Sequence, residues 1–369
     1  MESKIKKEKE VLYLGNFNSV RSFAAFNRAI GISKIFNYLD YKVHFVVNND
    51  DTALLSSIYG DMNIKFHNIL LSKKKFYFSS TVFMKLIKTI NNLTHVVLYN
   101  FPSLATLPII SYCKKNNIKI IGDITEWYDT SNVSLFMKPI KWLDTSFRMR
   151  VFNKKMDGLI VISDYLYNFY KKSRVEIIKI LPTMDSYENL TRNNNNDVLT
   201  IGYAGFAGKK KENIIMCIED VFLKNIDKKK VRFEFIGKID MKVIRYLEEN
   251  HILYNYYGWI SHDLTIEKLL TCDCEIIFRH KNRTNNAGFP SKFAEAVSLG
   301  LPIIRNNFSD LESFKSPFIY SIDSNEVPFN AFVDFIKKNK ECDYVFKNQF
   351  KSSYYFDAFS NFLEKIQNC

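Results

Sequence analysis

The sequence predicts an α/β protein with two domains, each built around a doubly wound parallel sheet. Short apolar runs alternate with segments of helical apolar spacing along the chain, which is typical of repeated strand-then-helix units. With 369 residues, the chain is long for a single ordinary domain. A polar stretch over 183–197, which contains four consecutive asparagines, separates two series of these units and is the best linker candidate.

The first series supplies the N-terminal domain, predicted over 1–185. Its strands are short apolar runs, and each helix places apolar residues at a spacing of three or four. The expected strands are 11–15, 42–47, 64–71, 95–99, 118–122 and 158–162, and the expected helices are 21–39, 81–91, 102–116 and 139–155.

The second series supplies the C-terminal domain, predicted over 186–345. The expected strands are 199–203, 232–236, 254–257, 275–278 and 302–305, with helices at 212–224, 241–249, 264–271 and 291–299. A last helix is expected over 345–367, so the segment 346–369 is treated separately. In open α/β sheets, ligands bind at the carboxyl ends of the strands, so both domains are expected to offer sites there.

Composition narrows the function classes. Hydrophobic residues make up 47% and charged residues 25%, which is globular. The net charge of +13 indicates an anionic partner: nucleic acid, an anionic membrane surface or a phosphorylated substrate. No nucleic-acid motif is present. The six cysteines lack zinc-site spacing and are expected as free thiols in a reducing cytosol, and we expect no signal peptide, no membrane span and no metal.

The most informative stretch is NNAGFPSKFAEAVSLGLPIIRNN, residues 285–307. It is expected to run from a turn at 285–288 into a helix whose first turn holds Pro290 and which ends at Gly300. A helix N-terminus attracts phosphate, Lys292 adds a full charge, and Glu295 is placed to accept two ribose hydroxyls. The alternative is a surface helix with a Lys292–Glu295 pair.

GFPSKFAEAVSLGLPII resembles the donor-binding motif of the retaining GT-B glycosyltransferases of family 4, in a subgroup with GFP-(S/T)-KF. The resemblance implies that Glu295 is the second Glu of the family's motif. The first would fall at Ala287, and its role would pass to Asn286 or to the backbone amides of Gly288 and Phe289. The resemblance covers nearly the whole chain in architecture, and it implies that a C-terminal helix in the segment 346–369 returns to the N-terminal domain. Only the second-half motifs are specific.

A second candidate stretch is TIGYAGFAGKKKENI, residues 200–214. Glycines after a strand bring backbone N–H groups together, and lysines neutralise phosphate. The resemblance places Lys210 at the family's diphosphate-binding Lys, with Lys209 as a neighbour that would substitute for it. The family's Arg falls at Gly205, and Arg279, at a strand end, is our candidate for a second diphosphate ligand. The alternative is a surface turn with solvated lysines.

In the first half, IIGDITEWYD brings Asp123 and Glu126 to the end of a strand. This pair is our catalytic candidate, orienting an acceptor hydroxyl or taking its proton. The alternative is that Asp123 caps a helix with Glu126 three residues later. Many family members present a His in this stretch, whereas this chain has no His there. Arg28 is a weaker candidate for the acceptor side.

The resemblance implies a retaining glycosyltransferase that moves a sugar from a nucleotide diphosphate sugar, expected to be UDP-linked, to a glycan or lipid-linked acceptor in bacterial surface-polysaccharide assembly. We expect no separate cofactor and a cytoplasmic location. Two basic, aromatic segments, 73–78 and 141–155, suggest the inner face of the plasma membrane, although such helices more often bury their aromatic residues. The alternatives are an inactive GT-B scaffold or partner subunit and, less favoured, a GT-B nucleotide-sugar epimerase.

Overall fold

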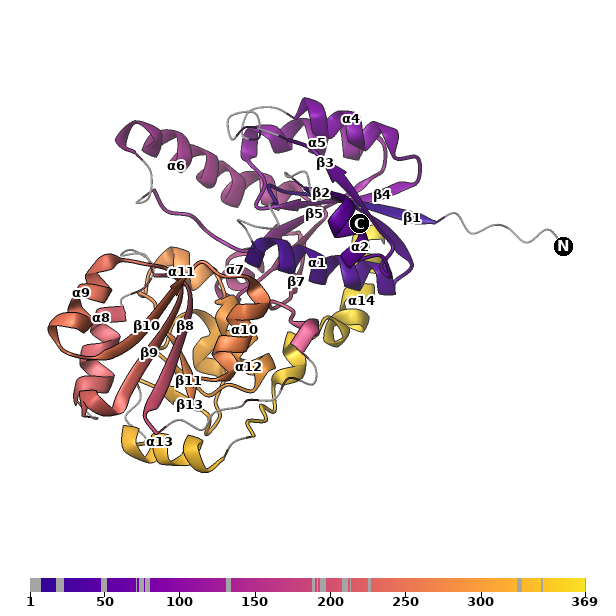
Figure 1. Ribbon diagram of the computed structural model, residues 1–369. Helices are drawn as coiled ribbons and strands as arrows, with labels where there is room; N and C mark the ends of the chain where they lie inside the picture. The colour runs from indigo at the N-terminus through magenta and orange to yellow at the C-terminus, as the bar shows by residue number, and fades with distance from the viewer. Residues whose placement is uncertain are drawn as a thin grey trace. The chain divides into compact units, whose positions relative to one another are not determined.

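The computed structural model describes residues 8–17, 23–47, 52–70, 72, 76, 80–130, 134–187, 190, 192, 197–207, 212, 214–224, 227–323, 327–339 and 341–368. The chain divides into two compact units, each containing one parallel sheet (Figure 1). Unit 1 comprises Met1–Thr183, Ala287–Phe289 and Lys351–Cys369, and unit 2 comprises Met184–Asn286 and Pro290–Phe350.

Unit 1 is built on a seven-stranded sheet in the order β3-β2-β1-β4-β5-β6-β7, and all its strand pairs are parallel. The inner strands are buried along most of their length, which is why they read as apolar runs. The strands are β1 (Lys9–Leu14), β2 (Tyr41–Val47), β3 (Ile64–Asn68), β4 (Leu93–Tyr99), β5 (Lys119–Ile124), β6 (Gly158–Val161) and β7 (Glu176–Lys179).

The helices of unit 1 follow their strands in sequence, as expected for a doubly wound sheet. They are α1 (Phe23–Tyr38), α2 (Thr52–Ile58), α4 (Thr81–Thr89), α5 (Ser103–Lys115), α6 (Lys138–Phe147), α7 (Asp164–Tyr170) and α14 (Phe356–Asn368). Helix α14 packs against α1 and β7, and the ring centroids of Phe359 and Phe36 lie 4.9 Å apart. The sequence analysis missed α2, α7 and β7, which are short elements of four to seven residues.

Unit 2 repeats the same strand order with one strand fewer. Its six-stranded sheet runs β10-β9-β8-β11-β12-β13, again with parallel pairs. The strands are β8 (Leu199–Ala207), β9 (Val231–Ile239), β10 (Leu253–Gly258), β11 (Cys274–Ile277), β12 (Ile303–Arg305) and β13 (Ile319–Ser321). The helices are α8 (Ile214–Cys217), α9 (Met241–Glu249), α10 (His262–Leu270), α11 (Arg283–Ala287), α12 (Ser291–Leu299) and α13 (Phe329–Lys338).

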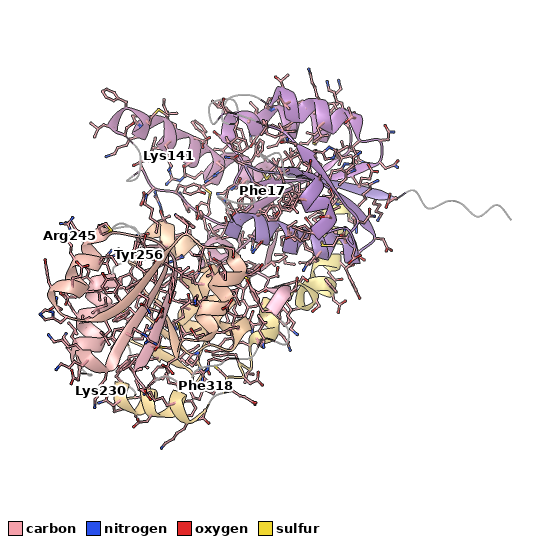
Figure 2. All side chains as sticks on the ribbon, viewed as in Figure 1. Phe17, Lys141, Lys230, Arg245, Tyr256 and Phe318 are labelled. Carbon is pink, nitrogen blue, oxygen red and sulfur yellow. The ribbon has the colours of Figure 1, made fainter. Side chains whose placement is uncertain are left out.

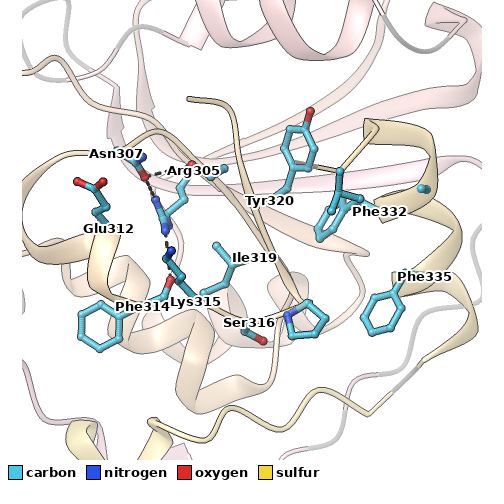
Figure 3. Close-up of a pocket in the computed structure, with 14 residues that line it drawn as sticks. Arg305, Asn307, Glu312, Phe314, Lys315, Ser316, Ile319, Tyr320, Phe332 and Phe335 are labelled. Atoms are coloured by element: carbon cyan, nitrogen blue, oxygen red, sulfur yellow. Dashed lines mark hydrogen bonds between the residues drawn. The ribbon is translucent and has the colours of Figure 1, made fainter. Parts of the chain in front are cut away.

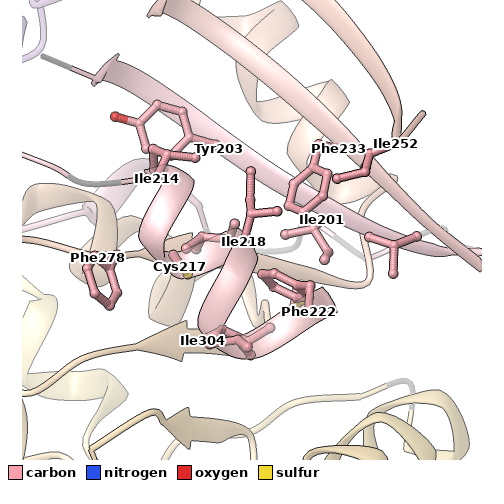
Figure 4. Close-up of a cluster of buried hydrophobic side chains, with 14 of the residues drawn as sticks. Ile201, Tyr203, Ile214, Cys217, Ile218, Phe222, Phe233, Ile252, Phe278 and Ile304 are labelled. Carbon is pink, nitrogen blue, oxygen red and sulfur yellow. The ribbon is translucent and has the colours of Figure 1, made fainter. Parts of the chain in front are cut away.

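The core of unit 2 lies between β8, β9 and the helical segment that starts with α8 and continues as a π-helical turn, Ile218–Leu223. Figure 4 shows Phe222 and Ile218 of this segment among the side chains of Ile201 and Phe233. Phe222 and Phe233 meet edge to face with ring centroids 5.3 Å apart, the arrangement that aromatic quadrupoles prefer. Because β8 and β9 are held from this side, their carboxyl ends are fixed in place.

The expected helix at 291–299 is confirmed as α12, and Gly300 follows its last turn with φ 65°, the left-handed conformation expected of it. One detail was wrong: Pro290 is not in the first turn but precedes it, with extended backbone. The turn expected at 285–288 was wrong for its first three residues, because they end the short helix α11. The Asn285 backbone N–H donates to Asn282 Oδ1 at 2.8 Å, which supports the start of that helix.

At the carboxyl ends of β8 and β9, two glycines face each other in register. Gly205 and Gly237 have φ of +137° and +99°, and a Cβ added to Gly237 would lie 2.2 Å from the carbonyl oxygen of Gly205. Gly237→Ala therefore adds a backbone clash to the strain of a positive φ. Gly258 offers a matched control, because it also has positive φ (62°) but no atom within 4 Å of the added Cβ.

We expect Gly237→Ala to destabilise unit 2 by about 3 kcal/mol or more, against about 1 kcal/mol for Gly258→Ala. Hydrogen exchange of the β8 and β9 amides measures this, because it reports the local free energy of opening. Equal exchange rates in the two variants would show that the facing glycines are not sterically required.

Candidate functional site

In unit 2 the chain order reverses between β8 and β11, because β9 and β10 lie on one side of β8 and the later strands on the other. This is the topological switch point, where loops from the two halves separate and leave room for a ligand at the carboxyl ends of the strands. The predicted site residues Arg279 and Lys292 both lie near this point. Arg279 comes two residues after β11, and Lys292 lies in the first turn of α12.

The structure brings Arg279 and Lys292 together around one carboxylate that the sequence analysis did not select, Glu212. Lys292 Nζ lies 3.2 Å from Glu212 Oε2 and 3.3 Å from Oε1, and Arg279 Nε lies 3.4 Å from Oε1. The hydroxyl of Tyr203 donates to Glu212 Oε2 as well. Lys292 Nζ also stands 3.6 Å from the centroid of the Tyr203 ring, within cation–π range. We call these four residues the Glu212 cluster.

Two local features hold the cations in place. The backbone of Arg279 is clamped by Asn306, whose Oδ1 accepts from the Arg279 N–H at 2.9 Å while its Nδ2 donates to the Arg279 carbonyl at 2.8 Å. The side chain of Lys292 lies over Gly205, where an added Cβ would be 2.7 Å from Lys292 Cε. Gly205 therefore makes room for the lysine of α12.

The electrostatics of the Glu212 cluster leave an excess of positive charge. Burial raises the pKa of Glu212, but Lys292 and Arg279 outweigh it, so that this pKa is lowered overall. Burial lowers the pKa of Lys292, against the opposing effect of Glu212. The neighbouring Glu275 is fully buried, and burial followed by the charge of Glu295 raises its pKa well above the usual value, which favours its neutral form. Within the Glu212 cluster, two cations share one carboxylate, so the cluster can bind a further anion.

Glu295 occupies a second, separate network in α12. The Tyr187 hydroxyl donates to Glu295 Oε1 at 2.9 Å and lies 2.5 Å from His262 Nε2, which then donates to the Tyr187 oxygen. Burial raises the pKa of Glu295 to about 7, although the Tyr187 hydrogen bond and Lys292 lower it. Burial lowers the pKa of His262. Tyr187 and His262 were missed; Tyr187 lies in the stretch read as a linker, and no local signal identifies it.

The remaining predicted donor-site residues are distributed as follows. Asn286 is held through its Oδ1, which accepts from the Ser309 backbone N–H at 3.4 Å. Gly288 and Phe289 are buried and belong to unit 1 by their contacts. Lys209 and Lys210 lie outside the described residues.

In unit 1, Asp123 is buried and fully engaged by side chains of β1 and α1. Arg28 donates to Asp123 Oδ1 from Nη2 at 2.8 Å and from Nε at 3.0 Å, and the Tyr13 hydroxyl donates to Oδ2 at 2.5 Å. Asp123 caps no helix, because β5 continues to Ile124 and no helix follows over 125–129. The helix-cap alternative was therefore wrong, and the contacts of Asp123 are those of a structural ion pair with Arg28. Glu126 is half-buried and accepts from the Tyr128 hydroxyl.

Arg148 is the residue of unit 1 with the clearest unused binding capacity, and the sequence analysis missed it. It begins the π-helical turn Arg148–Phe152 after α6, a geometry that recurs at functional sites. Its Nη1 donates to the Asn100 carbonyl at 2.8 Å, directly after β4, whereas Nε and Nη2 have no hydrogen-bond partner among the described residues. Its guanidinium lies 5.3 Å from the Tyr128 ring centroid, and Lys141 Nζ lies 5.1 Å from it. This group would suit an anionic or hydroxyl-rich ligand.

A cavity of about 440 Å³ in unit 2 lies apart from these groups, between β13, α13 and the segment from Glu312 to Pro317. Figure 3 shows Phe332 and Phe335 on one side of it and Arg305 with Asn307 on the other. The Arg305 guanidinium donates to Asn307 and to the Phe314 carbonyl, and burial lowers its pKa to about 10. None of the predicted site residues lines this cavity.

Comparison with solved structures identifies the architecture. Anabaena HepE in complex with UDP and glucose matches with a TM-score of 0.60 and 11% identity, covering 97% of this chain and 99% of that chain. The chain has the GT-B fold.

Two further GT-B structures match over nearly their full length. An S. aureus TarM variant in complex with fondaparinux, α-GlcNAc-glycerol and UDP matches with a TM-score of 0.56 and 12% identity, covering 98% of this chain and 100% of that chain. WaaG, a glycosyltransferase involved in lipopolysaccharide biosynthesis, matches with a TM-score of 0.51 and 10% identity, covering 97% and 94%. No protein-family model matches the sequence, and no curated protein matches it significantly.

Proposed function

We propose that the protein is a retaining glycosyltransferase that transfers a sugar from a UDP-linked donor to a glycan or lipid-linked acceptor. The observation that carries the proposal is the Glu212 cluster, where Arg279 and Lys292 converge on a single carboxylate at the switch point of a GT-B domain. Two of the matching GT-B structures are complexes with UDP, and the involvement of WaaG in lipopolysaccharide biosynthesis supports a role in surface-polysaccharide assembly.

The chemistry follows from the excess positive charge. As the bond between the sugar's anomeric carbon and the donor phosphate breaks, the electron pair leaves with the diphosphate, and Lys292 and Arg279 stabilise that developing charge. The acceptor hydroxyl forms the new bond from the face that the diphosphate leaves, which gives retention, and its proton passes to the departing phosphate oxygen. Lys209 and Lys210 are proposed to contact the same diphosphate. Because nucleotide sugars are cytoplasmic metabolites, we place the reaction in the cytoplasm.

Glu295 is proposed to accept the two ribose hydroxyls of UDP, for which it must be ionised. Because its pKa is about 7, UDP affinity should rise from about pH 6 to about pH 8 as Glu295 loses its proton. In Glu295→Gln, affinity should fall about tenfold at the higher pH, and the rise with pH should shrink to that of the nucleotide's own phosphate. Isothermal titration calorimetry with UDP at the two pH values measures both effects.

Glu295→Gln should weaken UDP binding but increase the stability of the ligand-free protein. In the folded chain the pKa of Glu295 is about 7, whereas in the unfolded chain it returns to the ordinary glutamate value of 4.5, so folding becomes less favourable as pH rises between these values. Glu295→Gln should therefore stabilise the ligand-free protein at pH 8 by roughly 3 kcal/mol and not at pH 4.

Glu267→Gln is the matched control, because Glu267 is exposed on α10 of the same unit. It should change neither UDP affinity nor its pH dependence. If wild-type protein shows no UDP binding at either pH, the transferase proposal fails and the inactive-scaffold alternative is favoured. Unchanged binding in Glu295→Gln would remove only the ribose role.

A further inference from the structure

Helix α6 has its polar residues facing unit 1 and its apolar residues facing outward, the reverse of an ordinary surface helix. On the inner side, Thr145 is buried, and Asp144 Oδ1 accepts from Ser103 through the backbone N–H at 2.7 Å and the hydroxyl at 2.6 Å. Lys141, which Figure 2 labels, also lies on this helix, and its Nζ is 5.1 Å from the centroid of the Tyr128 ring. These polar contacts attach α6 to unit 1 and fix which side faces out.

The outward side carries a continuous apolar stripe. Four residues at spacings of four, three and four lie on one face of the helix and of the single 3₁₀ turn that precedes it. Their exposed fractions are 92% for Phe136, 46% for Ile140, 47% for Leu143 and 50% for Phe147. Leu135 and Trp142 flank the stripe and are also more than half exposed. We call these six residues the α6 stripe.

An isolated exposed apolar residue is ordinary on a protein surface, but a contiguous patch of this kind marks an interaction surface. Of the three aromatic residues in 141–155 that the more common alternative would bury, Trp142 and Phe147 are exposed and Phe152 is half-buried, whereas the neighbouring Met149 is buried. The polar inner contacts also mean that α6 does not need the stripe for its attachment. The stripe therefore has a partner other than the rest of unit 1.

The charge around the stripe indicates which partner. Between residues 134 and 155 the sequence contains six basic residues and one acidic residue, Asp144, and this carboxylate is turned inward to Ser103. Two of the basic residues are turned inward as well, because Lys141 lies over Tyr128 and Arg148 is buried. Arg150, Lys154 and Lys155 are exposed close to the C-terminal end of α6. A second copy of the chain would bring these cations together, and their repulsion opposes self-association through this face. An anionic bilayer offers both an apolar interior and negative headgroups.

We propose that the α6 stripe inserts into the headgroup region of an anionic lipid bilayer, with Trp142 at the interface and the surrounding cations against the headgroups. A helix that lies in the plane of the membrane needs only one apolar face, and it need not be long enough to cross the bilayer. Among the described residues we find no helix whose length and hydropathy would let it cross a bilayer. This proposal rests on unit 1 alone and does not depend on the donor chemistry proposed above.

The test is flotation of the full chain with vesicles of phosphatidylcholine alone or of phosphatidylcholine with about one third phosphatidylglycerol. We expect binding to the anionic vesicles, weakened by salt because surface charges are screened. Phe136→Ser with Leu143→Ser should reduce the binding constant at least tenfold, because two large side chains lose their transfer into the apolar phase. Trp142 should give a fluorescence blue shift on binding, absent in Trp142→Phe.

Leu104→Ser with Val345→Ser is the matched control, because both residues are highly exposed at 61% and 101% but lie outside the α6 stripe. This double variant should float like wild type. The proposal is overturned if wild-type protein does not float with anionic vesicles, or if the Phe136/Leu143 variant floats equally well. It is also overturned if sedimentation shows a dimer that these substitutions dissociate, since the stripe would then join two copies.

Discussion

Replacing Lys292 by methionine is expected to lower kcat/KM for hydrolysis of the preferred UDP-sugar by about 10²–10³-fold, the effect of removing one preorganised charge-stabilising group. In the Glu212 cluster, Arg279 and Lys292 together face a single carboxylate. Removing Lys292 leaves Arg279 and Glu212 to neutralise each other, so the Glu212 cluster no longer offers the diphosphate a net positive charge. UDP binding and the rate of the chemical step should both fall, which separate kcat and KM values would show.

Glu212→Gln makes the opposite change, because it removes the negative charge of the Glu212 cluster. Glu212 is the anion that the two cations share in the ligand-free protein, at 3.2 Å from Lys292 and 3.4 Å from Arg279. Without its charge the cluster is more positive, and UDP affinity should increase. If Glu212→Gln and Lys292→Met weaken UDP binding equally, the cluster is a structural ion pair and the diphosphate binds elsewhere.

Lys281→Met is the control for general charge effects. Lys281 lies in the same unit, between β11 and α11, but its side chain is 59% exposed and pairs with Asp323. An exposed pair of this kind contributes little. This variant should keep wild-type UDP affinity and hydrolysis, so a loss comparable with that of Lys292→Met would point to an effect of net charge on the whole unit.

The second large effect is on stability: Asp123→Asn should destabilise unit 1 by about 3–5 kcal/mol, because it leaves the buried Arg28 charge without its partner. Arg28 is 4% exposed, and its remaining contact is the Ile180 carbonyl at 2.9 Å from Nη1. Hydrogen exchange of the β1 and β5 amides would measure the loss. Replacing both charges, as in Arg28→Met with Asp123→Leu, should recover part of it, since no unpaired charge then remains.

This experiment also decides between two roles for Asp123. A catalytic carboxylate would lose activity on substitution by Asn while unit 1 stayed as stable as wild type. A structural partner of Arg28 would lose stability first. Glu126→Gln is the matched control three residues away. Glu126 is half-buried and should tolerate the loss of its charge with little change in hydrogen exchange.

The sequence alone determined the architecture of both units. Buried parallel strands are apolar along their length and helices repeat every three to four residues, so local patterns were enough to predict two doubly wound sheets. The same holds for α12, whose start at Ser291 and left-handed Gly300 follow from local backbone preferences. Among the elements that were missed, β7 and β13 have four and three residues, too few to establish a period, whereas the ten-residue helix α13 was missed although it is long enough to show one.

Tertiary structure decided which charges meet. Glu212 and Lys292 are 80 positions apart, Arg28 and Asp123 are 95 apart, and Tyr187 and Glu295 are 108 apart. No local pattern encodes such pairs, because a partner is chosen by which distant segments pack side by side.

The α6 stripe shows most plainly what local sequence determines and what tertiary structure determines. Its spacing predicted a helix, and a helix formed, but an apolar spacing is identical whether the stripe faces a core or solvent. Contacts with distant residues, among them the hydrogen bonds that Asp144 accepts from Ser103 across 41 positions of chain, set which side of the helix faces out. Local sequence fixes the periodicity of an element, and the contacts of distant residues fix its orientation.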